Sequence, residues 1–392
     1  MDLSYSAEHE AFRGEVLAFI KAHGHETPKP GRGAALAWQK LLIEHGYAAR
    51  TIPALYGGFG AEPDILKSRV IAEEFARAQI SPGMGGQGIS MLVPTLLEMG
   101  SEEQKTTYVR PTLRGEMIWC QGYSEPDAGS DLASLRTRAD LDGDDWVVNG
   151  QKIWTSTAHL ADWIFCLVRT EPQAAKHEGI SFLLFSMKTP GIEVRPLVDM
   201  TGVANFNEVF FTDVRVPKDQ IVGRRGEGWR VANSILKNER GSLADANMMQ
   251  ARLNALIELM KAETLDGRRA IDNPVFRDRL MQIEGRVLAL RCNDLRLLSC
   301  ALNHRDPGLA AMVVKLQGTE LRHELEGLAI DVMGEMGLLY GETPHLRGGG
   351  SWQRDYMYFL GLIIGGGTSQ IQKNIISERG LGLPREPKTV SA

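Results

Sequence analysis

Three short segments of this sequence combine glycine, hydroxyl and aromatic residues in ways that suit the binding of a phosphate group or a flat heterocycle. The first spans residues 121–131 and places two glycines, one proline and two serines in a tight turn after a predicted strand. Backbone amides and hydroxyls in such a turn can hold a phosphate or a ring. A plain strand-exit loop is the alternative, and for this turn considered alone that alternative is favoured.

The second segment, residues 149–157, places Trp154 beside small hydroxyl residues at the predicted end of a strand. A Trp in this position can stack on a flat ring while a neighbouring hydroxyl bonds the ring's edge. A core Trp next to a turn is an equally good interpretation.

The third segment, residues 365–372, begins with three consecutive glycines and is followed by the sequence LGLPR at 381–385. Glycines let a backbone approach a ligand closely. The segment is not a dinucleotide-binding fingerprint, because no strand followed by GxGxxG is present. The alternative is a flexible loop between helices.

Changes in hydrophobic period divide the elements that must position these segments into three parts. Residues 1–116 are predicted to be helical, since Phe12, Val16 and Phe19 recur at helical spacing. Residues 117–226 contain short apolar runs separated by turn formers, which predict an antiparallel β domain. Residues 227–392 return to the helical period and predict a helical bundle. The predicted strands are 117–123, 146–149, 163–169, 180–185, 192–198 and 208–214.

Composition excludes several classes of protein. The net charge of −5 provides no basic excess for a polyanion, so we expect no nucleic-acid partner. Apolar stretches are interrupted well before the ~20 residues that a membrane span needs, and the N-terminus has no signal-peptide pattern, so we predict a cytoplasmic protein. The cysteines Cys120, Cys166, Cys292 and Cys300 form no CxxC pair and are predicted to be buried free thiols, with no metal site.

The three segments, together with two others, resemble the acyl-CoA dehydrogenase family in order and separation. The matching stretches are PALYGGFG at 53–60, SEPDAGSD at 124–131, WTS at 154–156, DVRVP at 213–217 and GTSQ at 367–370. The resemblance covers almost the whole chain. It implies a mainly helical fold with a helical N-terminal domain, a middle β domain and a C-terminal four-helix bundle, which agrees with the changes in period.

The resemblance also implies roles for individual residues in an enzyme that uses FAD to form an α,β double bond in an acyl-CoA. The turn that contains Gln121 and Gly129 would wrap the flavin, with Ser124 at its edge and Ser130 at the CoA phosphates. Further contacts with FAD or substrate are implied for Trp154, Ser156, Thr368, Gln370, Arg240 and Gly367. Electrons would pass to an electron-transferring flavoprotein.

The catalytic base is the point at which this sequence departs from many members of the family. They carry Glu directly before Gly-Thr-Ser-Gln, where this chain has Gly366. A minority, including the isovaleryl and long-chain enzymes, has instead a Glu-Arg pair on the first C-terminal helix, which Glu239 and Arg240 match. Val231, Ile235 and Glu239 share one helix face, and a carboxylate on an apolar face is a better base because desolvation raises its pKa. Spacing alone slightly favours an ordinary solvated Glu-Arg pair.

In the resemblance, Glu239 removes the α-proton, the β-hydrogen leaves as hydride to the flavin, and the backbone N–H of Gly366 binds the thioester oxygen. The glycine triplet is similar to that of a bacterial subgroup that includes steroid side-chain dehydrogenases. A glycine at 366 leaves space beside the acyl Cα and Cβ, so we expect branched or ring-bearing substrates.

Two further departures concern contacts between subunits. The family's Arg-x-x-Phe-Gly stretch is replaced by GRRAIDNP at 267–274, where Arg268 or Arg269 takes the place of the arginine, and Glu335 adds a negative charge to a glycine-rich segment. These departures put the expected contacts between FAD and a neighbouring subunit in doubt. The resemblance implies a homotetramer or homodimer, and a heterotetramer stays open. An acyl-CoA oxidase and an FAD-binding partner subunit of a hetero-oligomeric dehydrogenase are the alternative functions.

Overall fold

The computed structural model describes residues 5–28, 31–242 and 245–385, with the side chains of 237–242 excluded. Contacts divide the chain into two compact units, Met1–Leu197 with Ala204–Ile235, and Val198–Val203 with Leu236–Ala392. The N-terminal helices and the sheet thus belong to one unit. The predicted domain boundaries at 116/117 and 226/227 stay predictions.

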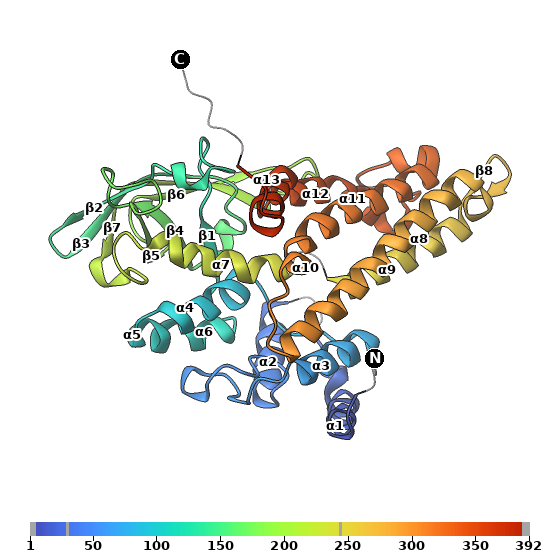
Figure 1. Cartoon of the computed structure of the whole chain (residues 1–392), viewed down its shortest axis with the longest axis horizontal. Coiled ribbons are helices and arrows are strands. Elements are labelled where there is room, and N and C mark those ends of the chain that lie inside the picture. Colours follow the sequence, from blue (N-terminus) through green and yellow to red (C-terminus); the bar gives the residue numbers. More distant parts are fainter. Residues whose placement is uncertain (1–4, 29–30, 243–244, 386–392) are drawn as a thin grey trace, which may run out of the picture. The chain divides into compact units, whose positions relative to one another are not determined.

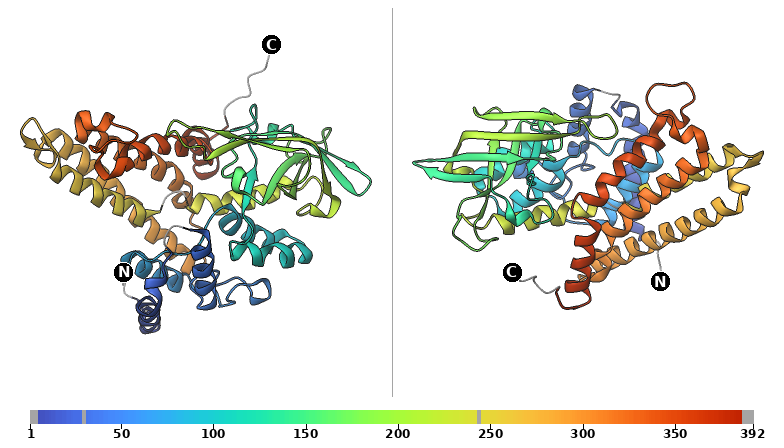
Figure 2. Two further views of the ribbon diagram at one scale, coloured as in Figure 1. Left: turned by 180° about the vertical axis from the view of Figure 1, so that it is seen from behind. Right: turned by 90° about the horizontal axis from the view of Figure 1, so that it is seen from above.

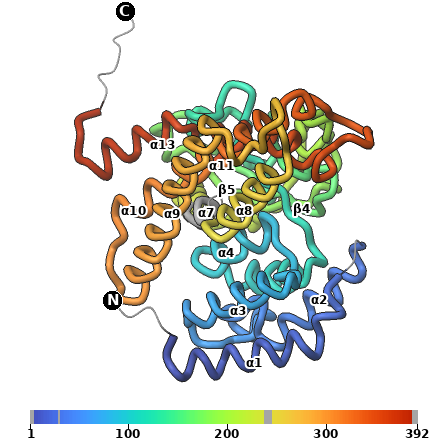
Figure 3. Tube along the Cα trace, turned by 90° about the vertical axis from the view of Figure 1, so that its right-hand side faces the viewer, coloured from blue at the N-terminus to red at the C-terminus, as the bar shows by residue number. Residues whose placement is uncertain are grey.

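The helices of the first unit are drawn in blue and cyan in Figure 1. Aromatic residues dominate the core of this helical part. Phe12, Phe19, Trp38 and Phe75 form its buried core together with aliphatic residues from three helices. Figure 3 shows α1 and α3, which are in contact, at the bottom of the view. The helices of this part are α1 (Ala7–His23), α2 (Arg32–Glu44), α3 (Ile65–Arg77), α4 (Val93–Met99), α5 (Glu102–Gln104) and α6 (Arg110–Leu113).

The β part of the first unit is one sheet with the order β1-β4-β2-β3-β7-β6, in which β5 also pairs with β4. All six predicted strands are present, and the sequence missed β2. Most pairs are antiparallel, as expected, but β1 runs parallel to β4. The sheet is therefore mixed, because a crossover through residues 123–162 separates β1 from β4. The strands are β1 (Trp119–Gly122), β2 (Arg138–Asp142), β3 (Asp145–Lys152), β4 (Trp163–Arg169), β5 (Ile180–Ser186), β6 (Ile192–Leu197) and β7 (Phe206–Pro217).

Residue patterns explain why β2 was missed and β4 and β5 were found. Strand β2, RADLD, buries only Ala139, so it carries almost no apolar signal. Strands β4 and β5 are buried over nearly their whole length, which gives a continuous apolar run. Their register pairs Trp163 with Ser186 and Arg169 with Ile180.

The second unit is the expected helical bundle. Figure 2 shows α8 and α9 side by side, joined by a hairpin of β8 and β9. The core contains Leu256, Ile283, Val287, Leu325 and Trp352. The elements are α8 (Ala246–Ala262), β8 (Thr264–Leu265), β9 (Arg268–Arg269), α9 (Pro274–Leu302), α10 (Leu309–Met312), α11 (Val314–Met333), α12 (Ser351–Ile364) and α13 (Ser369–Ile375).

Helix α7 (Gly228–Ser242) begins in the first unit and ends in the second. No helix among the described residues has both the length and the apolar content that crossing a lipid bilayer requires. All four cysteines are free, but only Cys120 and Cys166 are buried. The prediction of buried thiols is wrong for Cys292, which lies on an exposed face of α9. Its apolar neighbours in the sequence lie on other faces of that helix. Cys300 is half-buried.

Candidate active site

The turn that follows β1 is closed by its own backbone. The amide of Glu125 donates to the carbonyl of Ala128 at 3.0 Å, and the amide of Ala128 donates back to Glu125 at 3.0 Å. Gly129 and Ser130 lie exposed beyond this closure, whereas Gln121 and Ser124 are half-buried. The turn is therefore fixed at its base and open at Gly129 and at Ser130, the residue expected at the CoA phosphates.

A buried ion pair holds the turn onto β3. The ammonium of Lys152, which is 0% exposed, donates to Glu125 Oε1 at 2.8 Å and to the carbonyl of Tyr123 at 3.1 Å. The Glu125 carboxylate also accepts from the amides of Arg136 and Thr137. Burial alone would raise the pKa of Glu125, but Lys152 and these hydrogen bonds lower it below its ordinary value. A fully bonded carboxylate of this kind fixes the turn and is not available as a base.

The exit of β3 joins the same turn, because the amide of Ile153 donates to the carbonyl of Ser124 at 2.9 Å. On its other side, Asn207 of β7 exchanges backbone hydrogen bonds with Thr155, and its side-chain amide donates to the Thr155 carbonyl at 2.9 Å. Ser124, Ser156 and Trp154 are thus brought to one edge of the sheet.

Trp154 is held with its ring in the open. Its side chain is 59% exposed and its backbone has φ +58°, a left-handed conformation that costs non-glycine residues of order 1–3 kcal/mol. Among the described residues, the ring has one aromatic contact, an edge-to-face contact with Phe206 at 6.0 Å between centroids. The interpretation of Trp154 as a core residue is therefore wrong. Strained, exposed aromatic residues of this kind are found at ligand sites.

We expect that Trp154→Ala will weaken FAD retention by roughly 2- to 10-fold, since stacking contributes about 0.5–1.5 kcal/mol beyond burial. Because the ring is mostly exposed, the free energy of unfolding of the apoprotein should change little. The measurement is equilibrium dialysis of FAD, with Trp154→Phe as the control that keeps a stacking face. An FAD affinity of Trp154→Ala equal to that of the parent protein would show that the ring does not contact the flavin.

In the second unit, the three glycines form a fixed loop between α12 and α13. Gly366 and Gly367 have φ values of +64° and +93°, a backbone conformation that glycine adopts without strain. Lys315 Nζ donates to the Gly367 carbonyl at 2.6 Å, and Gln372 Nε2 donates to the Gly366 carbonyl at 3.2 Å. These two hydrogen bonds hold the carbonyls of Gly366 and Gly367 in place.

The residues after the glycines have different environments. The hydroxyl oxygen of Thr368 accepts from the amide of Ile371 at 3.1 Å and so caps α13. Ser369 is buried and Gln370 is exposed. Thr368 thus has a structural task besides any contact with a cofactor.

Four other residues that the sequence analysis singled out lie in the second unit. Glu239 and Arg240 fall within α7, but their side chains lie outside the described residues. Arg268 is exposed at the tip of the β8–β9 hairpin, which turns at Asp266 and Gly267. Glu335 is exposed after α11. Among the described residues, no cluster of three His, Cys, Asp or Glu side chains is able to hold a metal ion.

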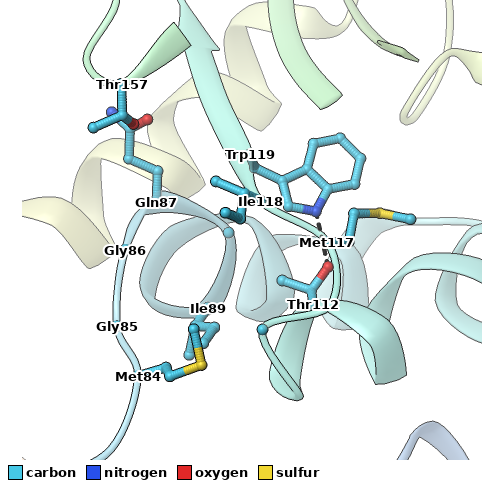
Figure 4. Close-up of a pocket in the computed structure, with 12 residues that line it drawn as sticks. Met84, Gly85, Gly86, Gln87, Ile89, Thr112, Met117, Ile118, Trp119 and Thr157 are labelled. Carbon is cyan, nitrogen blue, oxygen red and sulfur yellow. Dashed lines mark hydrogen bonds between the residues drawn. The ribbon is translucent and has the colours of Figure 1, made fainter. Parts of the chain in front are cut away.

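A small pocket of about 80 Å³ lies in the first unit (Figure 4). Its walls are the glycine-rich loop before α4, the end of α6, the start of β1 and Thr157. The lining residues are Met84, Gly85, Gly86, Gln87, Gly88, Ile89, Thr112, Gly115, Met117, Ile118, Trp119 and Thr157.

Comparison with known proteins shows what this arrangement belongs to. Sequence models of the N-terminal, middle and C-terminal domains of acyl-CoA dehydrogenase match residues 6–116, 120–214 and 226–381. Acyl-CoA dehydrogenase IpdE1 of Mycobacterium tuberculosis is 41% identical over 90% of this chain and 89% of its own length. The chain belongs to the acyl-CoA dehydrogenase family.

Solved structures of acyl-CoA dehydrogenases share the fold over the whole chain. The ChsE4–ChsE5 complex from Mycobacterium tuberculosis superposes with a TM-score of 0.81 at 31% identity, covering 98% of this chain and 100% of that chain. The Tcur3481–Tcur3483 steroid ACAD superposes with a TM-score of 0.81 at 28% identity and the same coverage. The chain is therefore an oxidoreductase that dehydrogenates an acyl-CoA, and the members of its family are flavoproteins.

Sequence reasoning missed several residues that shape this acyl-CoA dehydrogenase site. Lys152 and Asn207 lie in strands and look like ordinary polar strand residues, yet both are 0% exposed and fix the loops around Trp154. Thr155 is buried, and its hydroxyl has no hydrogen-bond partner among the described residues. The sequence gave no signal for Asn207, because β7, FNEVFFTDVRVP, also carries Glu208, Asp213 and Arg215.

Proposed function

We propose that this acyl-CoA dehydrogenase uses FAD to form an α,β double bond in a branched or ring-bearing acyl-CoA and passes the electrons to an electron-transferring flavoprotein. The observation that carries the proposal is Trp154, an exposed ring held in a strained backbone conformation beside Ser156 and Ser124. A flat cofactor gives that ring a face to stack on.

The residues present fit FAD in two further respects. The buried hydroxyls of Thr155, in the first unit, and Ser369, in the second, have no hydrogen-bond partner among the described residues, and buried polar groups without partners often mark ligand sites. The residues that would hold the cofactor are Gln121, Ser124, Gly129, Ser130, Trp154, Ser156, Thr368 and Gln370, with Arg268 reaching a neighbouring subunit's cofactor. When bound, FAD would accept the β-hydrogen of the substrate as a hydride, that is, as two electrons and one proton.

Residues of the chain accept the α-proton and donate a hydrogen bond to the thioester oxygen. Glu239, in α7, takes the α-proton, because Gly366 offers no carboxylate at the alternative position. Negative charge develops on the thioester oxygen, and the backbone N–H of Gly366 donates to it. The carbonyls of Gly366 and Gly367 are already bonded to Gln372 and Lys315, so the loop that presents this N–H is fixed before substrate arrives.

The proposal is tested by anaerobic titration of the purified protein with acyl-CoA thioesters while flavin absorbance near its visible maximum is followed. Bleaching by at least one acyl-CoA, followed by reoxidation with electron-transferring flavoprotein and not with oxygen, supports the proposal. Rapid reoxidation by oxygen would instead indicate the acyl-CoA oxidase alternative. Protein that binds no FAD would contradict the proposal.

We expect cyclohexanecarbonyl-CoA and branched acyl-CoAs to have higher kcat/KM than butyryl-CoA, by roughly 10- to 200-fold for a pocket that discriminates by about 1–3 kcal/mol. The glycine at 366 leaves the space beside the acyl Cα open. A panel of acyl-CoAs measures this directly. The Gly366→Glu exchange is a poor substitute test, because φ +64° strains any side chain there. Butyryl-CoA as the best substrate would contradict the expectation.

A partner-subunit function is the second candidate, and two observations favour keeping it. The similar structures named above are each composed of two different gene products, and this chain has an exposed Glu335 in a segment that is glycine-rich in the family. The ratio of FAD to chain after purification separates the candidates. One FAD per chain supports a homotetramer or homodimer, whereas half an FAD per chain in a mixed complex supports a heterotetramer.

A further inference from the structure

The pocket in Figure 4 has rigid walls. The indole N–H of Trp119 donates to Thr112 Oγ1 at 2.8 Å. Gly88 packs so closely against these two side chains that an added Cβ would lie 2.7 Å from Trp119 Cδ1 and 2.9 Å from Thr112 Cγ2. On the opposite side, Gln39 accepts from the amide of Met84 and donates to the carbonyl of Leu113, both at 2.7 Å. The glycine-rich loop is thereby pinned to α6, so the pocket is formed without a ligand.

Gln87, one of the residues that line this pocket, has a buried amide oxygen. Its Nε2 donates to Gln121 Oε1 at 3.4 Å. Its Oε1 is buried and has no hydrogen-bond partner among the described residues. In Figure 4 the Gln87 side chain rises from the loop toward Thr157. The bond to Gln121 orients the amide so that its oxygen is the atom left to accept.

The pocket adjoins the residues around which the chemistry is expected. Thr157 follows Ser156 directly and lies two residues after Thr155. Gln121 lies on β1, at the start of the turn that is expected to bind the cofactor. The remaining walls are glycine backbone and the side chains of Met84, Ile89, Thr112, Met117, Ile118 and Trp119. A buried acceptor without a partner is unfavourable unless a ligand supplies a donor.

We propose that this pocket receives a part of the acyl group that carries a hydrogen-bond donor, such as a hydroxyl, and that Gln87 Oε1 accepts from it. The inference rests on the proposed function and narrows its substrate class. A site built around a hydrogen bond discriminates against an analogue that lacks the group more strongly than an apolar pocket discriminates by size. Gln87 is therefore a specificity-determining residue.

The experiment compares cyclohexanecarbonyl-CoA with its 2-, 3- and 4-hydroxy isomers and its 4-oxo analogue, by kcat/KM for flavin reduction. We expect at least one hydroxy isomer to exceed the unsubstituted ring by about tenfold or more. In Gln87→Met that ratio should fall toward one. In Met84→Leu, which changes the same pocket without changing its hydrogen bonding, the ratio should persist.

The outcomes are distinguishable. Equal kcat/KM for the unsubstituted ring and all hydroxy isomers in the parent enzyme would overturn the role of Gln87 and leave the proposed function intact. A preference for the 4-oxo compound would show that the amide presents its NH₂ group, and would overturn the assignment of an acceptor. A hydroxy preference that survives in Gln87→Met would also overturn it. If no acyl-CoA reduces the flavin, the proposed function fails, and the inference fails with it. The parent enzyme alone decides the first two cases if Gln87→Met does not fold.

Discussion

A Glu239→Gln variant is expected to show about 10²- to 10⁴-fold slower flavin reduction by its acyl-CoA substrate, which is the usual contribution of a general base. Glutamine preserves the length and nearly the shape of the side chain but cannot take the α-proton. The measurement is the rate of flavin bleaching in a stopped-flow instrument at saturating substrate. FAD content should be unchanged, because the change removes a proton acceptor and no cofactor contact.

The matched control is Glu227→Gln, one residue before α7. Its carboxylate pairs with Arg230 at 3.2 Å and accepts from the amide of Arg224 at 3.3 Å, which are ordinary surface interactions. Bleaching by this variant should stay within a few-fold of the parent rate, as expected for a solvent-exposed pair. A loss of less than tenfold in Glu239→Gln would rule out Glu239 as the base and would favour the interpretation of an ordinary solvated Glu-Arg pair.

Lys152→Met is expected to lower the free energy of unfolding by about 3–5 kcal/mol, because it leaves the Glu125 carboxylate buried without its partner. The lysine is 0% exposed and reaches two acceptors in the turn after β1. Urea-induced unfolding of the apoprotein, followed by circular dichroism, measures the loss. Because the same pair holds the turn in place, FAD binding should weaken as well.

The double variant Lys152→Met with Glu125→Gln supplies the control, since it removes both charges and should recover part of the stability.

The ion pair between Lys152 and Glu125 should also make the stability depend on pH. The pKa of Glu125 is lowered in the folded protein, so the stability from its carboxylate is fully present above the ordinary value of 4.5 and is lost as pH falls through the folded pKa. The parent protein should therefore lose stability below that pH more steeply than the double variant. Equal acid sensitivity would show that the pair contributes little.

Much of the fold could be predicted because the hydrophobic period is strong in most elements. Strands β4 and β5 are continuous apolar runs, and α9 and α11 repeat Ile, Val and Leu at helical spacing. The parallel pairing of β1 with β4 could not be predicted, because period specifies which face is buried and does not specify direction. Likewise, the charged strand β2 is held by its neighbours and not by burial of its own side chains.

The candidate site likewise contains residues that could be predicted from the sequence and residues that could not. Residue types indicated the three segments that contain Ser124, Trp154 and Gly366, and the resemblance to the acyl-CoA dehydrogenase family supplied the roles of these residues. The orientation of the Gln87 amide depends on Gln121, 34 residues away, and the fixed glycine loop depends on Lys315, 52 residues before Gly367. Such roles arise from tertiary contacts, so a reading of local pattern does not reach them. Whether the predicted site residues bind as proposed stays a prediction for the experiments above.

The left-handed backbone of Trp154 has a consequence for laboratory evolution. Folding alone gives a strained, mostly exposed indole little reason to persist, and glycine adopts φ +58° without strain. A library screened for heat resistance of the apoprotein should therefore accumulate Trp154→Gly early. The same library screened for yellow colonies should retain the tryptophan. The residue selected at position 154 would then show whether the screen favoured heat resistance of the apoprotein or retention of the cofactor.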